Sequence, residues 1–121
     1  MYMAAINSYR DLLVWQKSMD LVTEVYKMTQ SFPTSELYAL TSQIRRSAVS
    51  IPSNIAEGYG RNSTNDYKRF LQIAVGSLFE LQTQIEIALN LNYISKNIFD
   101  EIFEKAKELD RMLLSLIKKI N

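Results

Sequence analysis

The stretch LTSQIRRSAVSIPSNIAEGYGR, residues 40–61, decides the fold, because it holds the residues that depart most from an ordinary amphipathic helix. It contains the chain's only Arg-Arg pair, a proline within a helical pattern, and two of the three glycines. Its apolar residues recur every three or four positions, a spacing that predicts one inward helical face. These residues are Leu40, Ile44, Ala48, Ile51 and Ile55.

Pro52 leaves two interpretations of this helix open. Proline lacks an amide N–H, and its ring collides with the carbonyl four residues earlier, here that of Ala48. The helix either ends near Ser50 and restarts at Pro52, or continues through Pro52 with a kink. The apolar spacing stays in phase across the proline, which favours the continuous helix. Gly58 and Gly60 are then expected to end it.

Three further amphipathic helices surround this segment in the sequence. They are expected over residues 12–30, from residue 63 to about 91, and from residue 95 onward, with Asp11, Ser63 and Ser95 as N-caps. Thr34 or Ser35 can cap the second helix. The connections are short, so sequence neighbours must lie antiparallel. We therefore predict an all-α fold, an antiparallel up-down-up-down four-helix bundle. The inner stripe expected for the first helix is Trp15, Met19, Val22, Val25 or Tyr26, and Thr29. The inner stripe expected for the third helix is Tyr67, Phe70, Leu71, Ala74, Leu78, Leu81, Ile85 and Ala88.

Composition bounds the function. The 121 residues predict a single domain, 1–121, with residues 1–10 as an N-terminal arm. Cysteine and histidine are both absent, which excludes disulfides, thiolate chemistry and histidine-based metal or acid–base sites. We expect a protein that is not an enzyme, needs no cofactor or metal, and takes no small-molecule substrate. The sequence shows no secretory leader and no long apolar run, so a cytoplasmic setting without membrane contact is expected.

Positive charge is concentrated in residues 37–79, which carry a local balance of +3 although the whole chain carries only +1. The start of the third helix could hold an anion such as a backbone phosphate, with Arg61, Lys68 and Arg69 around it. A solvated basic helix start is the ordinary alternative. The residues predicted to contact nucleic acid are Arg45, Arg46, Arg61, Lys68 and Arg69.

A polar set on the second and third helices has two interpretations. Asn54, Glu57 and Glu80 are predicted to form a structural polar network. Arg45 or Arg46 could pair internally with one of these carboxylates and fix the packing register. Alternatively both arginines are exposed and bind a ligand. Glu57 and Glu80 make only a weak catalytic pair, because nothing else in the chain supplies a nucleophile.

Surplus apolar surface points to self-association. Several large apolar residues fall off the inner stripes, and Gly76 within a helix suggests close backbone approach of the second helix or of a neighbouring subunit. A homo-oligomer is therefore expected. The residues assigned to its interface are Val49, Tyr59, Ile73, Gly76, Phe79 and Ile87.

The sequence resembles the 23S ribosomal RNA intervening-sequence proteins of bacteria. Three runs carry the resemblance: residues 43–48 (QIRRSA), 50–58 (SIPSNIAEG) and Gly60-Arg61. Flanking matches include Val14-Trp15-Gln16 and the segment 70–81. The resemblance covers nearly the whole chain from Tyr9 onward and implies a four-helix bundle in a ring, typically a homopentamer. The accessory variability proteins of diversity-generating retroelements, a related group, are similar in fold and use a basic pentameric surface with a reverse transcriptase and nucleic acid.

Two functions follow as expectations. The first is a non-enzymatic, homo-oligomeric bundle that associates with nucleic acid, preferably structured RNA, through a basic surface multiplied by ring symmetry. The second is a protein-interaction scaffold ring with no intrinsic affinity for nucleic acid, in which a nucleic-acid-processing protein or another protein is the partner. The sequence does not name the RNA or the protein.

Overall fold

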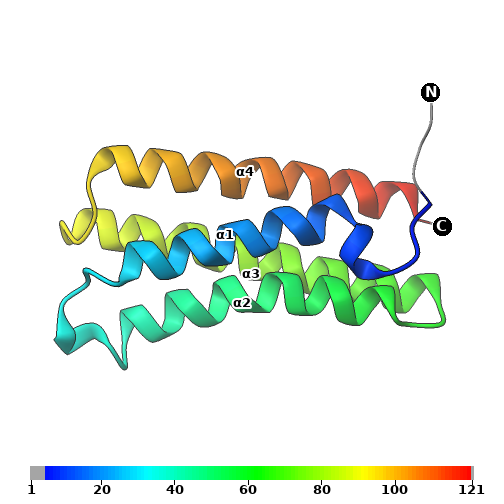
Figure 1. The fold of residues 1–121 in the computed structure, drawn as a ribbon, viewed down its shortest axis with the longest axis horizontal. Helices are drawn as coiled ribbons and strands as arrows, with labels where there is room; N and C mark the ends of the chain where they lie inside the picture. Colours follow the sequence, from blue (N-terminus) through cyan, green and yellow to red (C-terminus); the bar gives the residue numbers. More distant parts are fainter. Residues whose placement is uncertain (1–4, 121) are drawn as a thin grey trace.

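Four helices make up the computed structural model, which describes residues 5–120. They are α1 (Leu13–Thr29), α2 (Leu40–Tyr59), α3 (Thr64–Asn90) and α4 (Lys96–Lys119). Two short 3₁₀ helices, η1 (Tyr9–Asp11) and η2 (Thr34–Glu36), precede α1 and α2. The four helices run alternately up and down along one long axis (Figure 1), as the short connections predicted.

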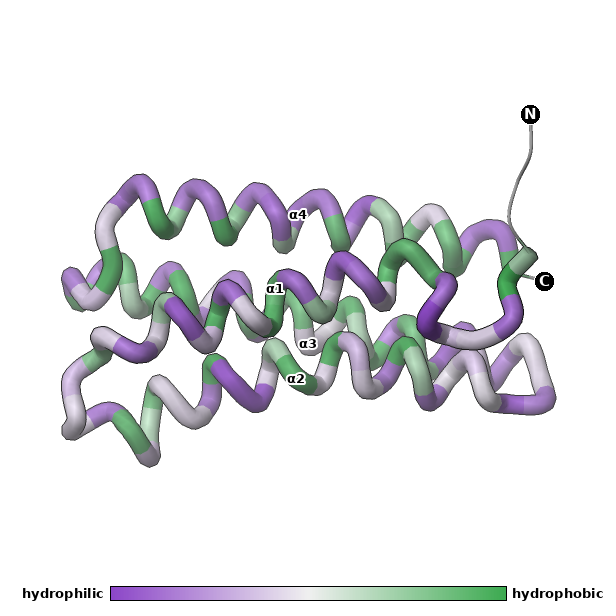
Figure 2. Tube along the Cα trace, viewed as in Figure 1, coloured by the Kyte–Doolittle hydropathy of each residue, from purple (hydrophilic) through white to green (hydrophobic). Residues whose placement is uncertain are grey.

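Each helix packs against two others, so the bundle is square in section. Contacts join α1 to α2, α2 to α3, α3 to α4 and α4 to α1, and within the described residues none joins the diagonal pairs. On α4 the hydrophilic positions lie along the outer side of the bundle and the hydrophobic positions along the inner side (Figure 2), and all four helices contribute apolar residues to the buried core. The predicted stripe of α2 is confirmed, because Ile44, Ala48, Ile51 and Ile55 are completely buried. The up-down-up-down four-helix bundle is confirmed as well.

The buried face of α1 agrees with the prediction in its second half, where Val25 and Thr29 are buried, and differs by about one position in its first half. Val14, Ser18 and Leu21 are buried, whereas Trp15 is half-buried and Met19 is 41% exposed. Ser18 tolerates burial because its hydroxyl donates to the carbonyl of Trp15 at 2.7 Å. A short polar residue that satisfies itself on its own helix can therefore occupy the core, and larger apolar residues turn towards the seam with α2.

The predicted caps at the starts of α1 and α2 are wrong. Ser8, not Asp11, begins the chain's first helical turn: its hydroxyl accepts from the amide of Arg10 at 3.1 Å, while the Asp11 carboxylate reaches back to the amides before it. Before α2, the Glu36 carboxylate accepts from the amide of Leu40 at 3.3 Å, in place of a Thr34 or Ser35 hydroxyl. Before α1 a hydroxyl therefore begins the first turn where a carboxylate was expected, and before α2 a carboxylate accepts where a hydroxyl was expected.

The caps of the last two helices are confirmed. Ser63 accepts from the amide of Asp66, and Ser95 accepts from the amide of Ile98. Between them, α3 ends in a Schellman motif in which Asn92 adopts φ 62° and the amide of Tyr93 donates to the carbonyl of Ala88 at 2.9 Å. Asparagine tolerates this left-handed conformation better than most residues, so it terminates α3 sharply.

The connections α1–α2 and α3–α4 meet at one end of the bundle (Figure 1) and are tied to each other. The Tyr93 hydroxyl donates to the Glu36 carboxylate at 2.7 Å, and this bond raises the pKa of Tyr93. The rings of Phe32 and Tyr93 lie 5.4 Å apart. Phe32 is buried beneath this contact and closes the end of the core.

α2 continues through Pro52 as a single helix, which confirms the continuous interpretation. Pro52 is buried, and the helix keeps its inner stripe on both sides of it. Two residues beyond the proline, the side chain of Asn54 donates to the carbonyl of Ser50 at 2.8 Å. The proline therefore removes one helical hydrogen bond without interrupting the face that packs in the core.

Of the two glycines expected to end α2, Gly60 does so as its C-cap, whereas Gly58 has another role. Gly58 lies buried inside α2, where an added Cβ would be 2.7 Å from the Cβ of Phe70 on α3, and Gly60 is the C-cap at φ −80°. Gly58 therefore permits close approach of two helices and does not end one. Gly76 is exposed, and an added Cβ would meet nothing within 4 Å. The predicted close approach of α2 at Gly76 is wrong.

Replacing each of these two glycines by alanine should have opposite effects. Gly58→Ala should lower the free energy of unfolding by about 1–2 kcal/mol, because overpacking against Phe70 exceeds the gain in helix propensity. Gly76→Ala should raise it by about 0.5–1 kcal/mol, since alanine favours the helix and meets no atom. Urea unfolding at several protein concentrations measures both and separates folding from association. A Gly58→Ala protein as stable as the parent would contradict the close approach.

Candidate functional site

The five cations predicted to contact nucleic acid lie in two groups, not one patch. Arg45 and Arg46 occupy the first half of α2, whereas Arg61, Lys68 and Arg69 surround the turn from α2 to α3. Arg46 lies thirteen residues before the end of α2 at Tyr59, about 20 Å along the helix axis, and Arg61 lies just beyond that end. The five cations, which share one stretch of the sequence, therefore lie at two separate places along the bundle.

Arg45 is held against α1. Its Nε donates to the hydroxyl of Thr29 at 2.9 Å, and its guanidinium lies 4.7 Å from the centre of the Tyr26 ring. These contacts satisfy the flat face and one edge of the guanidinium within the chain. Arg45 therefore joins α1 to α2 and offers only part of its donor set to a ligand.

Arg46, one position on, is exposed and free of ion pairs. No carboxylate within residues 5–120 lies within 4.0 Å of its guanidinium. It stands between two open grooves of about 600 and 470 Å³, and Tyr38 lines both of them. Tyr38 is 93% exposed, which makes it an aromatic surface directly beside a free cation.

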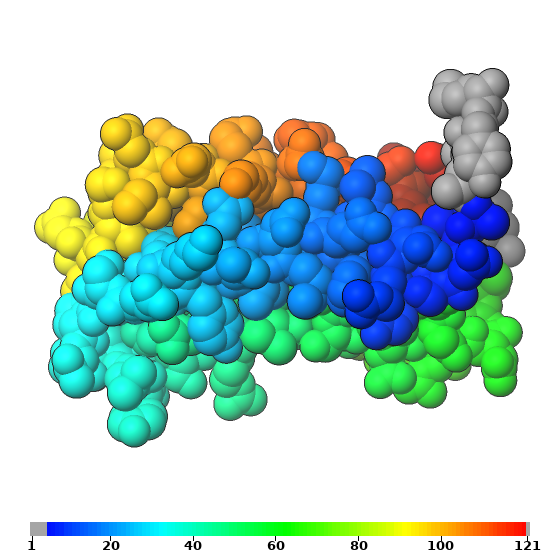
Figure 3. All heavy atoms as spheres, viewed as in Figure 1, coloured from blue at the N-terminus to red at the C-terminus, as the bar shows by residue number. Residues whose placement is uncertain are grey.

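The grooves beside Arg46 differ in chemistry. The larger groove is lined in part by apolar and aromatic residues, among them Tyr26, Leu37 and Val49. The smaller is polar and lies over the α2–α3 seam. It is lined by Tyr38, Ser42, Gln43, Arg46, Ser47, Ser50, Ser77, Glu80 and Gln84. Figure 3 shows α1 and α2 forming one continuous face, with the segment that joins them projecting at one end.

The second group of cations is largely neutralised by its own neighbours. Arg61 pairs with Glu57 at 3.1 Å and Arg69 with Asp66 at 3.5 Å, and both guanidiniums lie within 5.0 Å of the Phe70 ring centre. All four charged partners are substantially exposed, so each pair contributes about 0–1 kcal/mol and can open for a stronger ligand. Lys68 alone has no ion pair within the described residues.

The predicted polar network is only partly present. Asn54 donates to the Ser50 hydroxyl at 2.9 Å, and that hydroxyl lies 2.8 Å from the Ser77 hydroxyl on α3. Glu57 pairs with Arg61, outside this network, and Glu80 lines the polar groove without an ion pair in residues 5–120. The internal pairing of Arg45 or Arg46 with Glu57 or Glu80 is therefore wrong: Thr29 and Tyr26 hold Arg45, and Arg46 is free.

The apolar residues assigned to an oligomer interface form an outer stripe on α3 and a separate site on α2. Ile73, Phe79 and Ile87 are 43%, 50% and 42% exposed, and the exposed Gly76 lies on the same side of α3. On α2, Val49 is 40% exposed, while Tyr59 is half-buried edge-on against Tyr67. A second apolar groove, missed from the sequence, lies along the α1–α2 seam. It is lined by Tyr9, Trp15, Met19, Val22, Val49, Pro52, Ser53 and Ala56.

The titratable groups with shifted pKa values lie outside the two grooves beside Arg46. Burial raises the pKa of Tyr67, and the neighbouring Tyr59 raises it further by a smaller amount. Burial also raises the pKa of Asp110. The hydrogen bond to Glu24 raises the pKa of Lys105. These shifts follow from helix packing and surface pairs, so they supply no argument for acid–base chemistry at the candidate site.

The part of the chain that the structure describes holds neither a cluster of metal ligands nor a membrane-spanning helix. No three histidine, cysteine, aspartate or glutamate side chains gather there as metal ligands do. None of its helices combines the length and apolarity needed to cross a membrane.

Residues 10–115 match the family model described as 23S rRNA-intervening sequence protein. The chain belongs to this family. Its fold is also that of a solved structure, a protein of unknown function from the S23 ribosomal protein family of Bacteroides thetaiotaomicron. The two share 25% sequence identity over 88% of this chain and 96% of the other, with a TM-score of 0.82. A comparison with curated proteins finds no match.

The two neighbouring arginines should respond differently to alanine. Arg45→Ala should lower the free energy of unfolding by about 1–2 kcal/mol, because it removes a hydrogen bond and a cation–π contact between α1 and α2. Arg46→Ala should change it by less than about 0.5 kcal/mol, as expected of an unpaired surface residue. Thermal and urea unfolding measure both. An Arg46→Ala protein that loses more stability than Arg45→Ala would contradict these assignments.

Proposed function

We propose that this intervening-sequence family member is a non-enzymatic, homo-oligomeric bundle that associates with nucleic acid, preferably structured RNA, through cations on α2 and α3. The observation that carries the proposal is Arg46, an exposed guanidinium without a carboxylate partner in the described residues, beside the almost fully exposed ring of Tyr38. A free guanidinium binds phosphate oxygens, and an exposed ring can stack an unpaired base. The family name, which refers to 23S rRNA, agrees with this partner.

The geometry ranks the five cations. Arg46 and Lys68 are the primary phosphate contacts, because neither has a carboxylate partner in the described residues. Arg61 and Arg69 would contribute only after exchanging exposed pairs for phosphate, a cost of about 1 kcal/mol or less for each. Arg45 supports Arg46 from the adjacent position while remaining on Tyr26. The contacts are to the backbone, so binding should depend on salt and little on base sequence.

Self-association is part of the same proposal. The α3 stripe around Ile73 and Phe79 and the α1–α2 groove around Met19 and Val49 are different surfaces, and both are apolar. Contact between two unlike surfaces is head-to-tail, and such contacts close into a ring when the rotation permits. The resemblance to the family makes five subunits the expected number. A ring would repeat Arg46 and Lys68 around its axis and raise avidity without a strongly basic subunit.

The alternative is a protein-interaction scaffold ring with no intrinsic affinity for nucleic acid. The larger groove beside Arg46 favours it, since Tyr26, Leu37, Tyr38 and Val49 give the tyrosine-, arginine- and aliphatic-rich surface common in protein interfaces. In that case Arg46 would bind a carboxylate of a partner protein, because the paired N–H donors of a guanidinium fit a carboxylate as well as a phosphate.

The proposal predicts salt-dependent RNA binding that requires Arg46 and Lys68. Fluorescence anisotropy of a labelled RNA hairpin, over a series from low to physiological salt, should show affinity falling steeply with salt. The double variant Arg46→Ala/Lys68→Ala should bind at least about tenfold more weakly and show a shallower salt slope, because phosphate contacts are lost.

Lys118→Ala is the matched control, since Lys118 is an exposed lysine of α4, the helix diagonally opposite α2. It should leave affinity and salt slope unchanged. Equal affinity of the double variant and the parent would remove Arg46 and Lys68 from the site. No binding even at low salt would leave the scaffold function in its place.

A further inference from the structure

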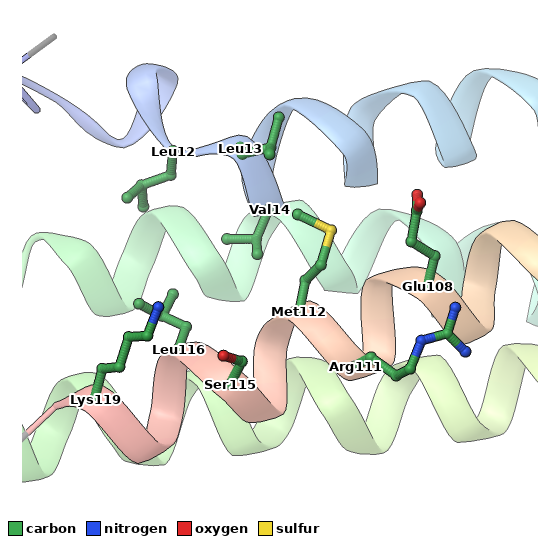
Figure 4. Close-up of a pocket in the computed structure, with 9 residues that line it drawn as sticks. All are labelled: Leu12, Leu13, Val14, Glu108, Arg111, Met112, Ser115, Leu116 and Lys119. Atoms are coloured by element: carbon green, nitrogen blue, oxygen red, sulfur yellow. The ribbon is translucent and has the colours of Figure 1, made fainter. Parts of the chain in front are cut away.

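A groove of about 550 Å³ opens between the start of α1 and the last turns of α4 (Figure 4). Its walls are aliphatic: Leu12 and Val14 face Met112 and Leu116 across the seam (Figure 4). Leu13, at the mouth, is 54% exposed. The bundle therefore leaves an apolar concavity at this end of the seam instead of closing α1 onto α4.

The rim of this groove is positively charged. Arg111 and Lys119, both on α4, stand two helical turns apart, about 12 Å, and neither has a carboxylate within 4.0 Å in residues 5–120. The third charged residue of the groove, Glu108, is held by Lys17 of α1 at 3.0 Å. The rim thus offers two cations in register along one side of an apolar floor.

This chemistry differs from that of the proposed nucleic-acid surface. None of the nine residues lining the groove is aromatic, so it provides no ring on which a base could stack. The groove lies on the α1–α4 seam, across the square bundle from the α2–α3 seam where the polar groove beside Arg46 is found. None of the residues lining this groove belongs to the α3 stripe or to the α1–α2 groove.

We propose that this groove docks a segment of a partner protein, an amphipathic helix with aliphatic residues on one face and two carboxylates about two turns apart. The aliphatic face would replace water over Leu12, Met112 and Leu116, and the carboxylates would meet Arg111 and Lys119. Charge complementarity selects an acidic partner over a basic one and fixes its register along α4. The flexible thioether of Met112 lets the floor adapt to different aliphatic side chains.

The test is fluorescence anisotropy of the full chain with a labelled, designed 18-residue helical peptide. It carries leucine along one face and two glutamates two turns apart. A second peptide has lysine in place of both glutamates. The parent protein should bind the glutamate peptide at least about tenfold more tightly than the lysine peptide. The double variant Arg111→Glu/Lys119→Glu should reverse that preference, whereas Lys118→Glu, a charge change on the same helix outside the groove, should preserve it.

One further variant and two further probes distinguish a protein partner from other ligands of the groove. Leu13→Asp changes an exposed side chain at the mouth of the groove and should weaken binding of the glutamate peptide at least about fivefold. Circular dichroism checks that every variant is folded. Equal binding of both peptides, or no effect of charge reversal, would overturn the proposal. Decanoate, a small anion with an alkyl chain, is the second probe. If the protein binds decanoate but not the peptide, the groove takes an alkyl anion and the proposal of a protein partner is wrong. RNA affinity should be unchanged in the charge-reversed variant, and its loss would assign the groove to the nucleic-acid surface.

Discussion

The close approach of α2 and α3 is the constraint on which the rest of this bundle depends. Gly58 lets the end of α2 lie against Phe70, and midway along the seam the Ser50 and Ser77 hydroxyls lie 2.8 Å apart. Small residues at these positions bring the two backbones together, which a larger side chain would prevent. Because α2 stays one helix through Pro52, its inner stripe remains in register with α3 along the whole seam.

This seam determines what is presented to solvent. With the inner face of α2 committed to the core and Arg45 held on Tyr26, Arg46 projects outward together with Tyr38. On α3 the same packing leaves Ile73, Phe79 and Ile87 on the outside. The molecule therefore combines a well-filled core with an exposed surface richer in large apolar and aromatic residues than folding alone requires, and both proposed partnerships follow from that surplus.

The sequence predicts helix positions well where periodicity and cap chemistry agree. The stripes of α2 and α3 and the caps Ser63 and Ser95 are confirmed for that reason. The first half of the α1 face differs from the prediction because Trp15 and Met19 are more apolar than Ser18, and spacing does not show that the Ser18 hydroxyl is satisfied on its own helix. Periodicity places a residue on a face, but it does not show the partner of a charge. The pairing of Arg61 with Glu57, the freedom of Arg46 and the exposure of Tyr38 therefore required the three-dimensional structure.

The central claim is that the apolar surface of α3 is covered by a second copy of this chain, and sedimentation equilibrium tests it most directly. The account predicts a stable oligomer at low micromolar concentration that dissociates into a folded, smaller species when Phe79, an exposed side chain without a role in the core, is replaced by lysine. A chain that sediments as a monomer up to high micromolar concentration, or a Phe79→Lys oligomer of unchanged mass, would contradict it.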